Sequence, residues 1–321
     1  MVKIFFLIKG HIPKGLIALI LLSIPLVLFA QGAWVKNGPD PVERQEVAAA
    51  SLDGKIYVAG GFKRGIFPSV TDLVEVYDPA SDTWKELAAL PAALHHNAVV
   101  AVKGKLYVIG GFKGLVSWEA VSTVYEYDPA QNAWRRKAPM PTARGALAIA
   151  VLNGKIYAVG GRRGDNDLDS NEVYDLEADS WAKRTGMPTA RDHLAAAAVG
   201  GKVYAIGGRL LSYSKNLAVN EAYNPEKDKW ESRAPMPAPR SGIAASELKG
   251  KVYVFGGESP EGTFNTVEEY DPKRDSWRKM APMPTARHGL GSAVAGETIY
   301  VIDGGTKPGG SVSGANEAFT P

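Results

Sequence analysis

The sequence contains no cysteine, and this absence excludes several kinds of site. Structural disulfides, thiol nucleophiles, iron–sulfur clusters and zinc sites built from thiolates all require cysteine side chains. A lipid anchor on an N-terminal cysteine is excluded for the same reason. Any catalytic or binding site must therefore use nitrogen, oxygen or aromatic groups.

Acidic residues are also missing from the start of the chain, where none occurs before Asp40. Three lysines precede the apolar run at 15–30, which has 16 residues and includes Pro25. A basic start followed by a short apolar core predicts an export signal over residues 1–30, and the run is short for a membrane span. We therefore expect an exported protein, periplasmic or extracellular, and keep an uncleaved N-terminal anchor as the alternative.

The apparent excess of positive charge belongs to this segment. It holds three of the 37 basic residues and none of the 34 acidic ones, so the remaining chain carries equal numbers of each. A neutral chain does not indicate a nucleic-acid partner. Contact with a membrane is expected only through residues 1–30, if they stay attached.

The sequence also lacks sustained helical periodicity, and it shows an internal repeat instead. Six tryptophans each lie 26 residues before a landmark, which is the first residue of a Gly-Gly pair or, in the last repeat, of Asp303-Gly304. The tryptophans are Trp34, Trp84, Trp134, Trp181, Trp230 and Trp277. Each repeat reads as four strands, with an alanine-rich first strand and an aromatic residue at the end of the third.

A four-stranded unit that recurs every 47–50 residues predicts a propeller blade. The expected fold is all-β: a six-bladed β-propeller over residues 31–321, with four antiparallel strands per blade. The last repeat ends at residue 321 with a third strand and no fourth, while a surplus strand surrounds Trp34. We therefore expect the N-terminal strand to close the last blade.

The double glycine, the Tyr-Asp-Pro turn and the tryptophan, at these separations, resemble the kelch-repeat family. The resemblance covers about residues 34–321 and implies a kelch-type propeller. The same fold hosts scaffolds and enzymes, so it carries little information about function. The blade number and the export signal also resemble the bacterial N-acetylneuraminate epimerase (sialic acid mutarotase) family, although none of that family's functional residues can be assigned here.

The variable part of each repeat lies between the landmark and the third-strand aromatic residue, where the separation ranges from 14 to 17. Because antiparallel strands alternate in direction, this loop opens at the same end as the link between blades. That link contains PMPTAR (139–144 and 282–287) and its near-copies. We expect its arginines near the mouth of the central channel; the alternative is that each donates to carbonyl oxygens of the adjoining blade.

Four histidines and an aspartate share the link with these arginines, and the variable loops add further polar and aromatic residues. The candidate ligand-binding residues are Arg44, His95, His96, Arg144, Arg191, Asp192, His193, Arg240, Arg287 and His288 in the links, with Arg64, Trp118, Arg162, Arg163 and Tyr213 in the loops. The histidines lack the sequence spacing of a metal site, so we expect no metal and no cofactor.

The sequence favours a binding module over an enzyme, because nothing identifies catalytic residues. Arginine forks and aromatic anchors predict that a protein, peptide or acidic glycan binds at the channel mouth, and the arginines predict that this ligand is anionic. The alternative is a cofactor-independent sugar isomerase resembling the N-acetylneuraminate epimerases, in which histidine and aspartate act as acid and base and arginine holds a carboxylate.

Overall fold

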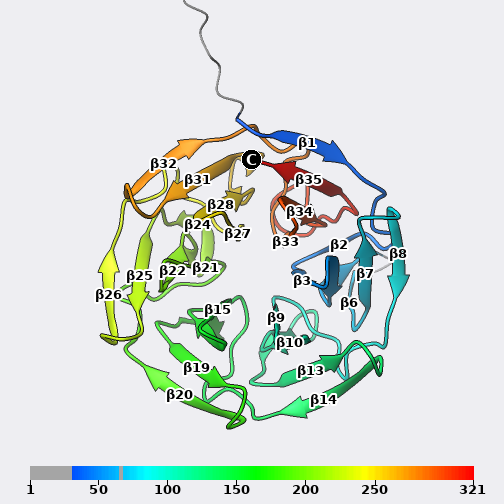
Figure 1. Cartoon of the computed structure of the whole chain (residues 1–321), viewed down its shortest axis with the longest axis horizontal. Helices are drawn as coiled ribbons and strands as arrows, with labels where there is room; N and C mark the ends of the chain where they lie inside the picture. The colour runs from blue at the N-terminus through cyan, green and yellow to red at the C-terminus, as the bar shows by residue number, and fades with distance from the viewer. Residues whose placement is uncertain (1–30, 65–67) are drawn as a thin grey trace, which may run out of the picture. The chain divides into compact units, whose positions relative to one another are not determined.

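The computed structural model describes residues 31–64 and 68–321, and Figure 1 traces them as a ring of small sheets around a central axis. The predicted export signal lies outside the described residues. Within them every regular element is a strand, as expected for an all-β chain. No helix in this part of the chain is long and apolar enough to cross a membrane.

Six antiparallel sheets of four strands each make up the described ring. Sheet one contains β3 (Ala48–Leu52), β4 (Lys55–Ala59), β7 (Val74–Asp78) and β8 (Thr83–Glu86); sheet two β9 (Ala98–Val102), β10 (Lys105–Ile109), β13 (Val124–Asp128) and β14 (Ala133–Lys137); sheet three β15 (Ala148–Leu152), β16 (Lys155–Val159), β19 (Asn171–Asp175) and β20 (Ser180–Arg184). Sheet four contains β21 (Ala195–Val199), β22 (Lys202–Ile206), β25 (Asn220–Asn224) and β26 (Lys229–Ser232); sheet five β27 (Ala244–Leu248), β28 (Lys251–Phe255), β31 (Val267–Asp271) and β32 (Ser276–Lys279); sheet six β33 (Gly291–Ala295), β34 (Thr298–Ile302), β35 (Asn316–Thr320) and β1 (Ala33–Lys36).

Short strands lie in the loops between the second and third strand of five sheets, and one of these loops also pairs with β2 in the link before sheet one. They are β2 (Arg44–Gln45) with β5 (Phe62–Lys63) and β6 (Ser69–Val70), β11 (Phe112–Lys113) with β12 (Glu119–Ala120), β17 (Arg162–Arg163) with β18 (Asn166–Asp167), β23 (Arg209–Leu210) with β24 (Ser212–Asn216), and β29 (Glu258–Ser259) with β30 (Gly262–Thr263).

The alanine-rich strands are innermost, as predicted. Each contacts its counterparts in the two neighbouring sheets, so that β3 touches both β9 and β33. Small side chains let these strands approach one another near the axis. Their hairpins turn on residues that tolerate positive φ, such as Asp53 (φ 51) and Gly54 (φ 76), which is the pattern of a two-residue hairpin loop.

The tryptophans connect neighbouring sheets. Trp84 donates from Nε1 to the carbonyl oxygen of Gly38 at 3.0 Å, and each later tryptophan reaches the corresponding carbonyl group before it. Trp34 makes the same bond to Ala281 O at 2.9 Å, across 247 residues of sequence. Strand β1 pairs with β35 in antiparallel register, and Trp34 lies opposite Phe319. The first and last segments of the described chain are therefore joined within one sheet.

The double glycines are needed where the link of the next repeat passes over the end of strand two. Gly110 has φ 62, and a Cβ there would lie 2.6 Å from the carbonyl oxygen of Arg144. Gly111 N donates to that same oxygen at 2.9 Å. A Cβ would clash at Gly110, and positive φ favours glycine at this crossing. Asp303 replaces the first glycine in the last repeat and has φ 58, so one repeat accepts the strain.

Candidate functional site

A ring of main-chain hydrogen bonds surrounds the channel at its mouth. Its members are the residues two positions after the link arginine, or after Leu94 in the second repeat, and all have φ between 49 and 63. The amides of the last five members each donate to the carbonyl oxygen of the previous member at 2.9–3.1 Å, and Val47 N, next to the first member, completes the circuit to Gly289 O at 3.4 Å. The members are Glu46, His96, Ala146, His193, Gly242 and Gly289.

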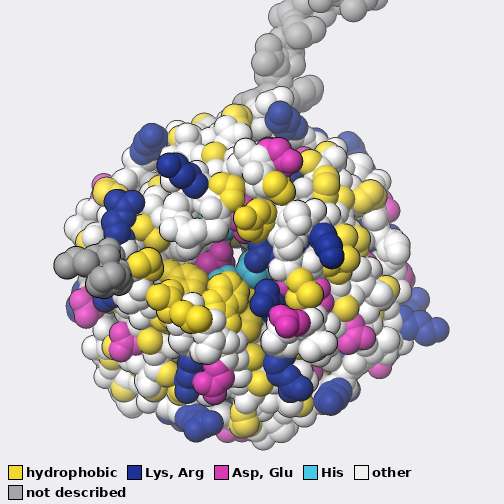
Figure 2. Space-filling view, turned by 180° about the vertical axis from the view of Figure 1, so that it is seen from behind, with side chains coloured by type: hydrophobic (Ala, Val, Ile, Leu, Met, Phe, Trp, Pro, Cys, Tyr) yellow, Lys and Arg dark blue, Asp and Glu magenta, His cyan; other side chains and the backbone are white. Residues whose placement is uncertain are grey.

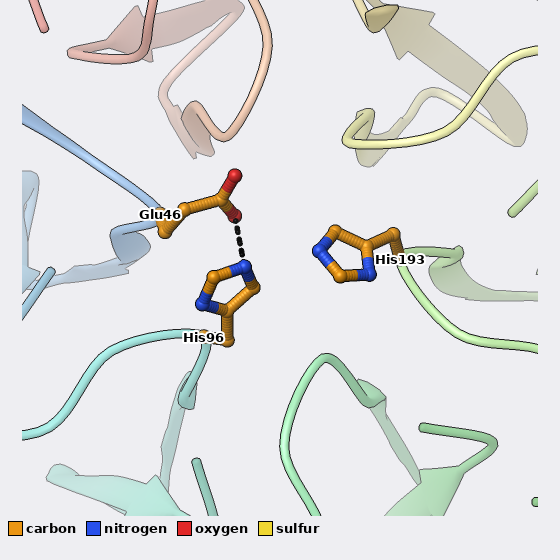
Figure 3. A group of neighbouring side chains, drawn as sticks. All are labelled: Glu46, His96 and His193. Carbon is orange, nitrogen blue, oxygen red and sulfur yellow. Dashed lines mark ion pairs between the residues drawn. The ribbon is translucent and has the colours of Figure 1, made fainter. Parts of the chain in front are cut away.

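Only three of the six ring members have long side chains, and these three converge. Glu46, His96 and His193 come from three separate links and point toward one another in Figure 3. Their ligand atoms all lie within 4.8 Å of one another. Ala146, Gly242 and Gly289 leave the rest of the ring open. The structure thus brings together histidines that are 97 residues apart in the sequence, and adds Glu46.

A chain of hydrogen bonds fixes the orientation of His96. His95 Nε2 donates to the carbonyl oxygen of Gly114 at 3.1 Å, because a carbonyl group can only accept. His95 Nδ1 then accepts from His96 Nδ1 at 2.6 Å, which leaves His96 Nε2 with its lone pair facing Glu46 Oε2 at 3.1 Å. Burial lowers the pKa of His95 to about 4 and that of His96 well below its usual value, so both imidazoles are neutral.

Glu46 has the complementary protonation state. Burial, followed by the nearby charge of Glu258, raises the pKa of the Glu46 carboxyl group to about 8. At neutral pH this carboxylic acid therefore donates its proton to the free lone pair of His96. A neutral acid beside a neutral base is an arrangement that can give and take protons.

His193 is held by charged partners on the opposite side. Its Nδ1 donates to Asp192 Oδ1 at 2.7 Å, and its Nε2 accepts from Arg209 Nη2 at 2.8 Å. Arg209 also donates to Asp192 at 3.2 Å and to Glu258 Oε1 at 2.7 Å. Burial is the main reason that the pKa of His193 is well below its usual value, and the charge of Arg209 adds to it. His193 is therefore neutral as well.

His288 completes the polar side of the channel mouth. Its Nδ1 donates to Gly305 O at 3.2 Å, so Nε2 faces Glu258 Oε2 at 3.4 Å and Glu46 Oε1 at 3.6 Å. Burial lowers the pKa of this imidazole. Three neutral histidines, one neutral glutamic acid and the pair formed by Arg209 and Glu258 thus define the deep end of the site.

A cavity of about 470 Å³ opens above these groups, a volume in the range of small-molecule sites. Figure 2 shows the hollow near the centre of this face, with histidine at its base and hydrophobic side chains along one side. Phe62, Leu115, Trp118 and Tyr213 supply apolar and aromatic surface. Glu46, His96, Arg209, Glu258 and His288 line the polar part.

Trp118 is the central aromatic residue of the apolar side. Its ring packs against His96 at 4.7 Å and Phe112 at 5.3 Å between ring centroids, and the guanidinium of Arg162 lies 5.3 Å above it. Its backbone has φ 42, a left-handed conformation that is unfavourable for a bulky residue. Such strain is maintained only where the surroundings enforce it, and it is common at binding sites.

The five link arginines do not reach this cavity, and here the sequence-based expectation needs correction. Their side chains are fully buried, and each guanidinium pairs with the glutamate two residues before the third-strand aromatic residue. The pairs are Arg44–Glu75, Arg144–Glu172, Arg191–Glu221, Arg240–Glu268 and Arg287–Glu317, at 2.5–2.8 Å. They also donate to strand carbonyl oxygens, which was the alternative interpretation.

A signal for this pairing was present in the sequence. The second repeat lacks the arginine, having Leu94 there, and it also lacks the glutamate, having Tyr125 at the matching position. Both replacements are buried in one hydrophobic cluster. Arginine and glutamate therefore disappear together and are replaced by two apolar partners, which indicates that they contact each other.

The remaining predicted residues divide between the cavity and its rim. His96, His288, Arg64, Trp118 and Tyr213 line the cavity, and His95, Asp192 and His193 are buried behind or beside it. Arg162 lies 3.9 Å from Asp192, whereas Arg163 is exposed and is absent from the lining. The sequence-based prediction missed Glu46, Phe62 and Glu258. Glu46 shares its position, two residues after the link arginine, with His193, and that register could have revealed it.

The described residues form a β-propeller with a cavity at one end of its channel. The chain belongs to the kelch-repeat family, because the KLHDC2/KLHL20/DRC7 Kelch-repeats domain matches residues 29–161 and 148–316. This agrees with the family resemblance inferred from the double glycines, Tyr-Asp-Pro turns and tryptophans.

Two curated relatives share short segments with this chain. It is 50% identical over 52 residues to the F-box/kelch-repeat protein At1g16250 of Arabidopsis thaliana, which is 15% of this chain and 12% of that protein. It is 36% identical over 62 residues to the Kelch-like protein terF of Aspergillus terreus, 19% of this chain and 14% of that protein. The chain thus matches only a small part of each relative's length.

A solved structure matches over nearly the whole ring. The structure of YjhT superposes with a TM-score of 0.75 and 18% sequence identity, covering 87% of this chain and 95% of that one. At this level of identity the match demonstrates the fold alone.

Proposed function

We propose that this chain is a six-bladed kelch propeller, closed by its N-terminal strand, that serves as a binding module for a protein or peptide partner. The observation that carries the proposal is the cavity at the channel mouth, which combines an aromatic wall with a polar floor. The pairing of β1 with β35 supports the closure. Kelch-repeat membership supports an interaction role, because propellers of this family commonly act as recognition surfaces.

Exposed apolar residues around the cavity favour a partner larger than a free metabolite. Leu115 is 43% exposed, Val116 91% and Tyr213 37%, and Leu210 and Leu211 are both 39% exposed. All five lie in two loops beside the cavity. Clustered apolar exposure of this kind marks interaction sites. A peptide segment can rest on these loops and insert one amphipathic side chain or chain end into the cavity.

The charges around the cavity change where an anionic group of the ligand is expected to bind. That expectation depended on the five link arginines, which are now assigned to internal ion pairs. Arg209 is balanced by Glu258 and Asp192, so the deep end is close to neutral. Lys63 and Arg64 line the outer part of the cavity. We propose that an anionic group of the partner lies at this basic rim, while an uncharged, hydrogen-bonding group occupies the floor.

A selection from a random peptide library followed by calorimetry tests the proposal. Trp118→Ala removes the aromatic anchor, and we expect the selected peptide to lose about 2 kcal/mol or more of binding free energy. Val35→Ser is the matched control, because Val35 is 61% exposed on the outer strand β1, away from the cavity. Equal affinity for wild type and Trp118→Ala, or failure to select any peptide, would contradict the proposal.

A sugar isomerase is the second candidate, and the pair formed by Glu46 and His96 favours it. A neutral carboxylic acid 3.1 Å from a neutral imidazole can protonate one oxygen of a bound sugar and deprotonate another. An acidic glycan or sugar acid is the expected ligand in this case, with its carboxylate at Lys63. NMR measurement of anomer exchange in sugar acids tests this candidate. Exchange that is accelerated by wild type and lost in Glu46→Gln would favour the isomerase over the binding module.

We also propose that the protein is exported, on the basis of the basic and apolar segment at 1–30. N-terminal sequencing of the protein recovered from its native compartment tests this. A start near residue 31 supports a cleaved signal with periplasmic or extracellular location. Retention of residues 1–30 in a membrane fraction indicates the uncleaved anchor, and retention in the soluble cytosol contradicts export.

A further inference from the structure

The imidazoles at the channel mouth share an arrangement that the proposed peptide binding does not require. In each of His96, His193 and His288 the Nδ1 atom donates to a fixed acceptor: His95 Nδ1, Asp192 Oδ1 or Gly305 O. In each the Nε2 lone pair faces the polar side of the channel mouth. Histidines that bind metals show this pattern, because a partner on one ring nitrogen fixes the tautomer and orients the other nitrogen toward the ion.

The Nε2 atoms of His96 and His288 both face the carboxyl group of Glu46, and the Nε2 atom of His193, which accepts from Arg209, lies near them. Ligand atoms of Glu46, His96 and His193 lie within 4.8 Å of one another, and His288 Nε2 is 3.6 Å from Glu46 Oε1. The main chains of the first three residues are fixed by the ring of hydrogen bonds. Ligands around a zinc ion lie about 2.0–2.2 Å from it, so small side-chain rotations close the remaining gap.

We propose that Glu46, His96 and His193 form a binding site for a divalent transition-metal ion of the zinc type at the floor of the cavity. Two imidazoles and a carboxylate are the ligand set of open zinc sites, which keep a further position for water or a ligand. Glu46, His96 and His288 line the cavity, so a ligand in the cavity can reach that position. The inference does not rest on the proposed peptide binding, because metal binding is measured without a peptide.

Arg209 is the competitor for this site. Its Nη2 donates to the same Nε2 atom of His193 that a metal ion needs. Its other bonds, to Asp192 and Glu258, limit how far the guanidinium moves when that one contact is released. Metal binding therefore requires a small displacement of Arg209, and the two cations oppose each other across His193.

Calorimetric titration of the purified protein with Zn²⁺, after treatment with a chelator, is the direct test. We expect one ion per chain, and an affinity lower by at least about tenfold in Glu46→Gln and in His96→Gln, since even loss of an outer partner has this effect. Glu86→Gln, an exposed carboxylate on β8, is the matched control and should bind like wild type. Absence of stoichiometric binding, or unchanged affinity in both site variants, would overturn the proposal.

Two further variants keep the result independent of a simple folding defect. His95→Phe retains an aromatic ring among Phe62, Phe112 and Trp118 but removes the acceptor that orients His96, so Zn²⁺ affinity should fall about tenfold to a hundredfold. Arg209→Met removes the competing cation, and Zn²⁺ should bind more tightly. Weaker binding by Arg209→Met would contradict the competition. The absorption spectrum of the Co²⁺ form reports directly whether imidazole and carboxylate coordinate the ion.

Discussion

Arg191 pairs with Glu221 at 2.6 Å in the interior of sheet four, and the same guanidinium donates to the carbonyl oxygens of Thr189, Ala205 and Gly207 at 2.7–2.9 Å. Neither side chain is accessible to a ligand. In this link the arginine therefore connects the link, the second strand and the third strand of one sheet, and four other links have an arginine paired with a third-strand glutamate in the same way. This explains why PMPTAR and its near-copies recur in the links with the arginine at a constant separation from the double glycine.

The first prediction concerns this ion pair. Arg191→Leu leaves Glu221 buried without its partner, and we expect a loss of about 3–5 kcal/mol in the free energy of unfolding, measured by urea denaturation. The double variant Arg191→Leu with Glu221→Tyr copies Leu94 and Tyr125 of the second repeat and should recover much of this loss. Arg274→Ala, at an exposed arginine, is the control. A double variant no more stable than the single one would contradict the pairing rule.

The second prediction concerns the N-terminal strand. Trp34 lies against Phe319 at a centroid distance of 4.9 Å and donates to Ala281 O, so it holds the first strand to the last sheet. We expect Trp34→Ala to cost about 3 kcal/mol of unfolding free energy, and deletion of residues 31–38 to lower the melting temperature of the whole ring. Val35→Ala, at the exposed neighbour, should have almost no effect. An unchanged melting temperature after the deletion would show that β1 is dispensable.

The third prediction is a dependence of stability on pH at the junction of the first and last sheets. Arg44 meets three buried carboxyl groups, Asp40, Glu75 and Asp303, where the other pairs have one. Burial, reinforced by Asp40, raises the pKa of Glu75 from 4.5 to about 8 and that of Asp303 well above its usual value. The folded state therefore holds protons that the unfolded chain releases, and stability should fall as pH rises from 4.5 to about 8.

Glu75→Gln removes one of these titrating groups. Above about pH 7.5, where unfolded histidines with an ordinary pKa of about 6.5 are also mostly neutral, the variant should lose less stability with rising pH than the wild type does. Glu46, whose pKa is also raised, leaves a residual slope in both proteins. Identical slopes for wild type and Glu75→Gln in urea denaturation would refute the assignment.

The fourth prediction concerns Asp303 itself. Asp303→Gly restores the residue found at this position in the other five repeats, removes the left-handed strain at φ 58 and eliminates one surplus carboxyl group. We expect a gain of about 0.5–1 kcal/mol, after allowance for the greater backbone entropy of unfolded glycine. The gain should be larger at alkaline pH. A loss of stability would instead show that Asp303 holds the junction together through Arg44.

The fold was largely predictable because its constraints are local and repeated six times. Trp84, its equivalents and the double glycines keep constant separations, since each contacts main-chain atoms of a neighbouring repeat. The strand order follows from those separations and from hairpin turns such as Asp53-Gly54. The innermost position of β3 and its equivalents follows from alanine content alone.

The site was only partly predictable, because the sequence fixes where a side chain starts but not where it points. Arg144 and His96 lie in equivalent links, yet the arginine turns into the sheet toward Glu172 while the histidine turns to the channel. His96 is a member of the ring of residues with positive φ, whereas Arg144 lies two residues before a member. The sequence spacings did not show that this ring exists. Glu46 was missed because a single glutamate stands out only when the links are aligned, and the alignment places it in register with His193.

The ring at the channel mouth has a consequence for how such proteins diversify. Its hydrogen bonds run through main-chain atoms only, so the side chains of its six members do not hold it together. Each of the six positions can therefore hold different side chains, and in this chain the residues are Glu46, His96, Ala146, His193, Gly242 and Gly289. Substituting these six residues changes the side chains that a ligand contacts, while the interactions that stabilise the blades stay the same. Ligand recognition can therefore evolve separately from folding.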